Sequence, residues 1–250
     1  MTDIQIPFHG CGKNNYPVRI EKELVNPEET IQKIIKNFKN VYEELDFYEF
    51  GTFEGRTLRS TVDIIEKLDL KINNIIGFDS LEGLPEEVLD KKNQSTWVKG
   101  EFKVNNKYNN PEEYIKYLNL KKIEGYKNFK FVKGFYKDSL NEEIIKKENL
   151  KPAKFINVDC DIYSSTLEIL EFIFKNKLYI EGITLIRYDD WGGFYENSSS
   201  YEEEFSMGEA RAHKEMTEKY NIKTERLGTF TCRSSTFGKG GLEETWFLII

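Results

Sequence analysis

The chain has 250 residues, of which 39% are hydrophobic and 32% are charged, a composition typical of one globular α/β domain with additions. Its formal net charge of −7 argues against a general affinity for nucleic acid, because phosphate binding needs a basic surface. No apolar run approaches the length of a membrane span, and the first residues lack the hydrophobic region of a signal peptide. Three distant cysteines without a C-x-x-C pair favour free thiols, so we expect a cytoplasmic protein with no membrane partner.

The first 45 residues are expected to form an N-terminal arm and a helix, ahead of a main domain over residues 46–250. Residues 1–25 contain several turn-forming residues and little periodicity, which predicts an irregular arm that serves as a lid or a dimer contact. Asn26 and Pro27 are typical of a helix start, and an apolar stripe from Ile31 to Val41 follows them.

The next stretch predicts a strand, a glycine turn and a helix. Phe47 to Phe50 has strand character, Gly51 and Gly55 interrupt it, and apolar residues recur at helical spacing from Thr57 onward. Glycine lets the backbone approach a ligand closely, and the free N–H groups at a helix start attract a carboxylate or phosphate. A tight connection without a ligand is the alternative for this stretch alone, because the spacing fits neither a dinucleotide fingerprint nor a Walker loop.

An acidic residue, Asp79, ends the following predicted strand, Ile72 to Asp79. A carboxylate at this place in a nucleotide-binding sheet accepts hydrogen bonds from ribose hydroxyls, so adenosine is expected in the ligand. A long polar stretch from Leu84 to Asn110 then separates this strand from the next, and long loops of this kind are usually functional covers or disordered.

Strands and helices alternate through the rest of the chain, which predicts a Rossmann-like, doubly wound, mostly parallel α/β sheet. The last two apolar segments resemble a C-terminal antiparallel strand pair. The expected strands are 128–132, 153–159, 182–190, 222–230 and 245–250, and the expected helices are 140–147, 165–177 and 202–220.

Acidic residues end two successive predicted strands, Asp159 and Asp161 after the first and Asp189 and Asp190 after the second. Acids are common in strand-to-helix turns as caps, but four at one edge of adjacent strands would repel one another unless a cation or proton intervened. Hard oxygen ligands without a nearby histidine favour magnesium, manganese, calcium or ferrous iron over zinc.

These segments together resemble the macrocin O-methyltransferase family, over a stretch from about Phe47 to Gly193. The resemblance is carried by the segments 48–55, 77–85, 133–135 and 158–166 and by the pair 189–190. Members depend on S-adenosylmethionine, usually require a metal, and methylate sugar hydroxyls in antibiotic and polysaccharide pathways. The resemblance therefore implies an S-adenosylmethionine-dependent enzyme with a small-molecule sugar substrate, either free or nucleotide-linked.

The resemblance also implies roles for individual residues. Glu49 and Gly51 would face the methionine part of the cofactor, with Gly55 and Thr57 in the same turn, and Asp79 would bind the ribose hydroxyls. Ser80 and the turn Gly134-Phe135 would border the adenine. Asp159, which also borders the cofactor, Asp189 and Asp190 would hold magnesium, manganese or ferrous iron.

Relatives carry a lysine base shortly after the first metal-binding aspartate, and this sequence has Cys160-Asp161-Ile162 there. Deprotonation is therefore expected from a carboxylate such as Asp161, from His213, or from a metal-activated hydroxyl that releases its proton to water. A homo-oligomer is expected. The alternatives are methylation of a phenol or a small phosphorylated metabolite, and a nucleotide-binding domain without catalysis.

Overall fold

A computed structural model of the chain describes residues 18–20, 23–25, 45–55, 57–58, 61–62, 65, 69–87, 97–104, 113, 128–191, 205–232 and 242–250. The helix predicted from Asn26 and much of the predicted cover from Leu84 to Asn110 lie outside these residues. Within them, no helix is both long and apolar enough to cross a membrane.

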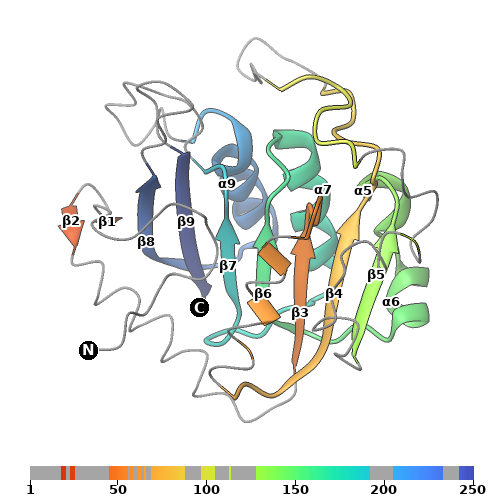
Figure 1. Ribbon diagram of the computed structural model, residues 1–250. Coiled ribbons are helices and arrows are strands. Elements are labelled where there is room, and N and C mark those ends of the chain that lie inside the picture. The colour runs from red at the N-terminus through yellow and green to blue at the C-terminus, as the bar shows by residue number, and fades with distance from the viewer. Residues whose placement is uncertain are drawn as a thin grey trace.

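One sheet of nine strands runs through the described part of the chain in the order β2-β1-β8-β9-β7-β6-β3-β4-β5 (Figure 1). The parallel strands are β3 (Leu45–Phe50), β4 (Ile72–Asp79), β5 (Phe129–Lys133), β6 (Ala153–Val158) and β7 (Leu185–Tyr188). The antiparallel strands are β1 (Val18–Ile20), β2 (Glu23–Val25), β8 (Thr224–Cys232) and β9 (Leu242–Ile249). The predicted mostly parallel sheet with a C-terminal antiparallel pair is confirmed.

The prediction of an irregular arm over residues 1–25 is wrong for two short segments, which form strands β1 and β2. β1 pairs antiparallel with β8, and β2 pairs with β1, so part of the arm extends the sheet at one edge. Neither strand is longer than three residues, and three residues give too few alternations for a periodic pattern to be recognised.

Helices cover one face of the sheet behind the strands in Figure 1: α5 (Tyr136–Ser139), α6 (Glu142–Glu148), α7 (Tyr163–Lys175) and α9 (Gly208–Tyr220). The alternation of side chains along the strands builds a core on this face, where Tyr48 and Phe50 of β3 join the buried residues of α7 and α9. Phe47 points to the opposite face and packs with Leu58 and Val62 of the helix that follows the glycine turn.

The order in which the chain adds strands to the sheet reverses between β3 and β6, although the two strands are parallel. From β3 the chain continues to β4 and β5 on one side, and it then returns to β6 on the other side. In an open α/β sheet, ligands bind outside the carboxyl ends of the strands at such a switch point. The glycine turn after β3 and the acidic loop after β6 are the two segments that flank it.

Candidate active site

The glycine turn packs directly against the end of β6. Gly51 has a φ of +84°. A Cβ on Gly51 would lie 1.6 Å from the carbonyl oxygen of Asp159, so no other residue fits without moving one of the two strands. The N–H of Asp159 donates to the carbonyl of Phe50 at 3.0 Å, which fixes the two strand ends side by side.

The turn closes four residues later and leads into the predicted helix. The N–H of Gly55 donates to the carbonyl of Thr52 at 2.6 Å, and the backbone is helical at Thr57. The structure therefore places Gly55 and Thr57 in the same strand–turn–helix unit as Gly51, as the sequence predicts. Whether they contact a cofactor stays a prediction.

Glu49 lies at the end of β3 with no exposed surface. Among the described residues, no side chain donates to its carboxylate oxygens, and the backbone N–H of Leu58 is the donor that faces them. Burial raises the pKa of Glu49 well above its usual range, and the positive charge of Arg187 opposes that shift. A buried carboxylate in this state fits a ligand that brings positive charge or N–H donors.

Asp79 ends β4, and the structure supplies its carboxylate with backbone donors. The N–H of Phe53, in the glycine turn, donates to one oxygen at 2.8 Å, and the N–H of Leu81 donates to the other at 2.6 Å. Burial raises the pKa of Asp79, and these backbone donors oppose the shift. Asp79 therefore joins the glycine turn to the loop after β4, in addition to any contact with a ribose.

The residues predicted to border the adenine lie at the ends of β4 and β5. Gly134 donates its N–H to the carbonyl of Asp79 at 3.0 Å, and Phe135 is the N-cap residue of α5. The hydroxyl of Ser80 donates to the carbonyl of Gly83 at 3.0 Å and so stabilises its own turn. The three predicted residues thus share one edge of the sheet with Asp79.

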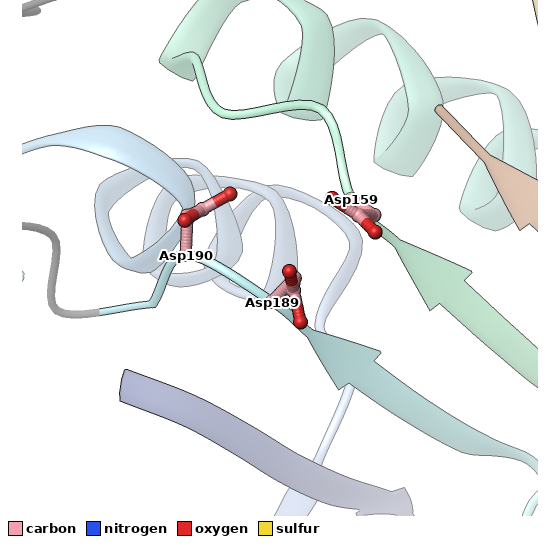
Figure 2. Close-up of side chains that lie close together, drawn as sticks. All are labelled: Asp159, Asp189 and Asp190. Atoms are coloured by element: carbon pink, nitrogen blue, oxygen red, sulfur yellow. The ribbon is translucent and has the colours of Figure 1, made fainter. Parts of the chain in front are cut away.

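Asp159, Asp189 and Asp190 come together at the ends of β6 and β7. One carboxylate oxygen from each lies within 4.8 Å of the others. Figure 2 shows the three side chains pointing into the space between the two strand ends. The N–H of Asp189 donates to the carbonyl of Val158 at 3.0 Å and holds the ends together. The three predicted residues therefore lie close together, and their binding of a metal stays a prediction.

The electrostatics of the cluster follow from its negative charge. Burial, and then the neighbouring Asp189 and Asp190, raise the pKa of Asp159 well above its usual range. Burial, and then Asp161 and Asp189, raise the pKa of Asp190 in the same way. Like charges this close cannot all ionise without a compensating cation, so the donor set of three hard oxygens fits a divalent ion.

Asp161 belongs to the same group of acids. Its φ of +63° lies in the left-handed region, where the chain turns from the end of β6 into α7. Burial, and then the charge of Asp159, raise the pKa of Asp161 well above its usual range, and a hydrogen bond with the side chain of Asp190 opposes that shift. The structure thus places this predicted base beside the predicted metal ligands.

The structure does not bring His213 into this group. His213 lies on α9 with 4% of its surface exposed, and its ring stacks on Phe247 at a centroid distance of 4.2 Å. Its two ring nitrogens lie 2.9 Å from the hydroxyl of Tyr188 and 3.3 Å from that of Thr224. Burial lowers the pKa of His213 to about 3, which makes the ring a weak base at neutral pH.

Two polar residues that were not predicted as site residues hold the loop after β7, which contains Asp189 and Asp190. Arg187 of β7 is fully buried and donates to the carboxylate of Asp189. Glu209 of α9, also fully buried, accepts from the N–H of Asp190 at 3.0 Å. The one available signal was Arg187 itself, a charged residue inside an otherwise apolar strand.

Comparison with known families gives a match over most of the chain. The model of the macrocin O-methyltransferase family (TylF) matches residues 21–218. A comparison with curated proteins finds no match.

Solved structures share the fold. The calicheamicin methyltransferase CalS11 superposes with a TM-score of 0.58 at 17% identity, covering 88% of this chain and 78% of that one. The O-methyltransferase NovP superposes with a TM-score of 0.56 at 15% identity, with the same shares covered. With the family model spanning well over half of its residues, this chain belongs to the macrocin O-methyltransferase family.

Proposed function

We propose that the protein transfers a methyl group from S-adenosylmethionine to a hydroxyl of a sugar, with a divalent metal at Asp159, Asp189 and Asp190. The observation that carries the proposal is the contact between Gly51 and Asp159, because it places the predicted cofactor turn against the predicted metal ligands. Donor and acceptor are then held at one point, and alignment is the main requirement of a methyl transfer.

The cofactor half of the site is supported by the two carboxylates at the ends of β3 and β4. S-adenosylmethionine carries an ammonium and a sulfonium, and Glu49 offers two buried oxygens to which no described side chain donates. Asp79 faces the loops that would border the ribose and adenine. Glu49 and Asp79 therefore suit S-adenosylmethionine in charge and in hydrogen-bonding capacity.

The acceptor half is supported by the acids after β6 and β7. Magnesium, manganese or ferrous iron bound there lowers the pKa of a coordinated hydroxyl and fixes its position. Asp161 lies beside these ligands, and a carboxylate with a raised pKa is suited to accept a proton near neutral pH. We assign the base to Asp161 rather than to His213, whose ring nitrogens face two hydroxyls in the core.

The acceptor itself is proposed to be a nucleotide-linked hexose or heptose of a surface polysaccharide or a natural-product glycoside. Beside Asp161, Tyr163 begins α7 with the guanidinium of Arg211 4.4 Å from its ring centre, and both side chains are bonded to Glu215. A sugar or a phosphate would have to displace these contacts, so the acceptor is proposed from the family and not from these two side chains. We further propose a cytoplasmic homo-oligomer.

The test is a methylation assay of the pure protein with labelled S-adenosylmethionine. The acceptors are nucleotide-linked hexoses and heptoses, the free sugars, a catechol and a phosphorylated small metabolite, each with magnesium and with a chelator. We expect label in a nucleotide-linked sugar only when metal is present. Label in the catechol or the phosphorylated metabolite alone would identify another acceptor class. Cofactor binding without label in any acceptor would favour a nucleotide-binding domain without catalysis.

A further inference from the structure

A row of buried polar side chains crosses three neighbouring strands below the acidic cluster. Glu49 of β3 is in register with Asn157 of β6, and Asn157 is in register with Arg187 of β7. Residues aligned in this way project from the same face of a sheet. All three have no exposed surface, and the positions two residues earlier on the same face, Phe47, Phe155 and Leu185, are apolar. A buried arginine in such a place requires a specific set of partners.

The partners of Arg187 come from two neighbouring strands, β6 and β9, and from the loop after β7. One terminal nitrogen, Nη1, donates to Oδ1 of Asn157 at 2.6 Å. The other, Nη2, donates to Oε2 of Glu244 in β9 at 2.9 Å and to Oδ1 of Asp189. A guanidinium is planar and stays charged, so anchoring it at Asn157 and Glu244 fixes the direction from which it meets Asp189.

We propose that Arg187 is a positioning residue of the metal centre, which holds Asp189 so that this carboxylate offers a metal one oxygen and not two. The inference rests on the proposed function, because it concerns the metal that Asp159, Asp189 and Asp190 would hold. Oδ1 of Asp189 is engaged by the guanidinium, and the opposite oxygen is then the one presented to the ion. Partners of this kind orient metal ligands and tune the affinity for the ion.

Coordination of the ion through one oxygen of Asp189 should affect which divalent ion the site prefers. Magnesium and manganese prefer six ligands in octahedral geometry, whereas calcium takes six to eight oxygens and often binds a carboxylate through both of its oxygens. A carboxylate whose second oxygen is committed to Arg187 disfavours the calcium geometry. Releasing Asp189 should therefore weaken manganese binding and shift the preference of the site toward calcium.

The experiment measures binding of manganese by electron paramagnetic resonance and of calcium by competition, in the full-length protein without acceptor. Arg187→Met removes the donors at similar volume, and Arg187→Lys keeps the charge without the planar fork. The matched control is Arg226→Met, since Arg226 lies in β8 with its guanidinium over the rings of Trp191 and Phe247. Thermal melting and cofactor titration are recorded for each variant.

We expect Arg187→Met to lower the manganese affinity about 10–100-fold, the range seen when a partner of a metal ligand is lost. Calcium affinity should fall less, so that the ratio of the two affinities moves toward calcium. Arg187→Lys should fall between the wild type and Arg187→Met, and Arg226→Met should bind manganese like the wild type.

Unchanged manganese affinity in Arg187→Met, or an equal loss of both ions, would overturn the positioning role and leave the proposed function standing. Should Arg187→Met not fold, an Arg187→Lys variant with wild-type affinity for both ions would overturn it. A wild-type protein that binds no manganese would instead remove the metal from the proposed function. The failure of the inference and that of the function are thus distinguishable.

Discussion

At the scale of single residues, the two carboxylates of the predicted cofactor site differ in their surroundings. Asp79 already accepts two close backbone N–H groups, whereas Glu49 is fully buried and accepts from no described side chain. An unsatisfied buried carboxylate costs stability until a ligand provides donors. The sequence placed both residues at strand ends, but it could not show this difference, which depends on the loops that fold over each one.

The first prediction concerns Glu49→Gln. The substitution removes the negative charge at nearly constant volume, so cofactor affinity should fall by about 1.5–3 kcal/mol, the range for hydrogen bonds to charged groups. The melting temperature of the ligand-free protein should change little, because burial already raises the pKa of Glu49 and so disfavours its charged form. Calorimetric titration with S-adenosylmethionine and thermal melting measure the two effects.

The matched control is Glu82→Gln, at an exposed position in the loop after β4. This control should change neither the affinity for S-adenosylmethionine nor the melting temperature. A Glu49→Gln variant that melts lower and binds cofactor normally would show that Glu49 is a structural residue.

The second prediction concerns His213, whose pKa is lowered to about 3 by burial. Because its ordinary value is about 6.5, the unfolded chain binds the proton that the folded chain excludes between these two values. His213 therefore costs no stability above about pH 6.5, and stability is lost as the pH falls below it, by up to about 1.4 kcal/mol per pH unit.

Urea denaturation of the wild type and of His213→Gln at about pH 7 and about pH 4.5 measures this contribution. Other titrating groups, including the acidic cluster, contribute to both proteins, so the difference between them isolates His213. We expect the wild type to lose about 2–3 kcal/mol more than the variant over this interval. Parallel curves would show that His213 becomes protonated without unfolding the core.

At the scale of elements, the periodicity of the sequence predicts where strands and helices lie along the chain. It does not predict which of these elements lie next to one another in the fold. Long alternating or apolar segments gave β4, β6, α7 and the C-terminal pair close to their observed bounds. The position of β9 between β7 and β8 depends on which strand edge is left open after the parallel strands have paired. This choice is made by packing of the whole sheet and is not encoded in any one segment.

The third prediction concerns the contact between the ends of β3 and β6. Gly51→Ala would place a methyl group 1.6 Å from a carbonyl oxygen, at a φ of +84°. It should destabilise the fold by more than about 3 kcal/mol, because strain and overlap act together. Gly100→Ala is the control: Gly100 has a φ of +85°, and apart from its chain neighbours no atom of the described residues lies within 4 Å of the added methyl group, so only strain of about 1–2 kcal/mol is expected.

Both substitutions are compared by urea denaturation. Equal losses for the two variants would mean that the strand ends separate easily and that their contact does not define the site.

The fourth prediction concerns the cover, of which residues 84–87 and 97–104 are described, and in particular its segment 97–104. Phe102 packs edge-to-face on Phe53 at a centroid distance of 5.8 Å, and Phe53 donates its N–H to Asp79. Cofactor binding at Asp79 should therefore slow hydrogen exchange in this segment, and Phe102→Ala should abolish the change. Exchange that is equal with and without cofactor would leave the segment as a surface loop.

At the scale of the whole molecule, the order of the strands explains why the two halves of the site are separate. The predicted cofactor residues lie at the ends of β3, β4 and β5, and the acids lie at the ends of β6 and β7, across the switch point. The sequence predicted both groups from strand ends alone. Glu209 and Glu244 could not be predicted, because they act through contacts between strands and helices far apart in the chain, and the partners of Arg187 could not be predicted for the same reason.

The last prediction follows from this separation. Removing divalent ions with a chelator should abolish methyl transfer and leave cofactor affinity nearly unchanged, because the proposed cofactor ligands Glu49 and Asp79 lie on the other side of the switch point. Added magnesium, manganese or ferrous iron should restore transfer. Asp189→Asn should lose transfer with or without metal, since one of three charged ligands is then missing.

The measurement pairs an activity assay with calorimetric titration of S-adenosylmethionine on the same samples. Asp138→Asn serves as the control, because Asp138 lies in α5, outside the acidic cluster. Full activity in thoroughly metal-stripped protein would remove the metal, and the acids would then act as a base or as structural groups, with Asp161→Asn the variant that separates these two roles. Loss of cofactor binding on chelation would instead show that metal and cofactor share ligands across the switch point, with Asp159 the residue that touches both sides.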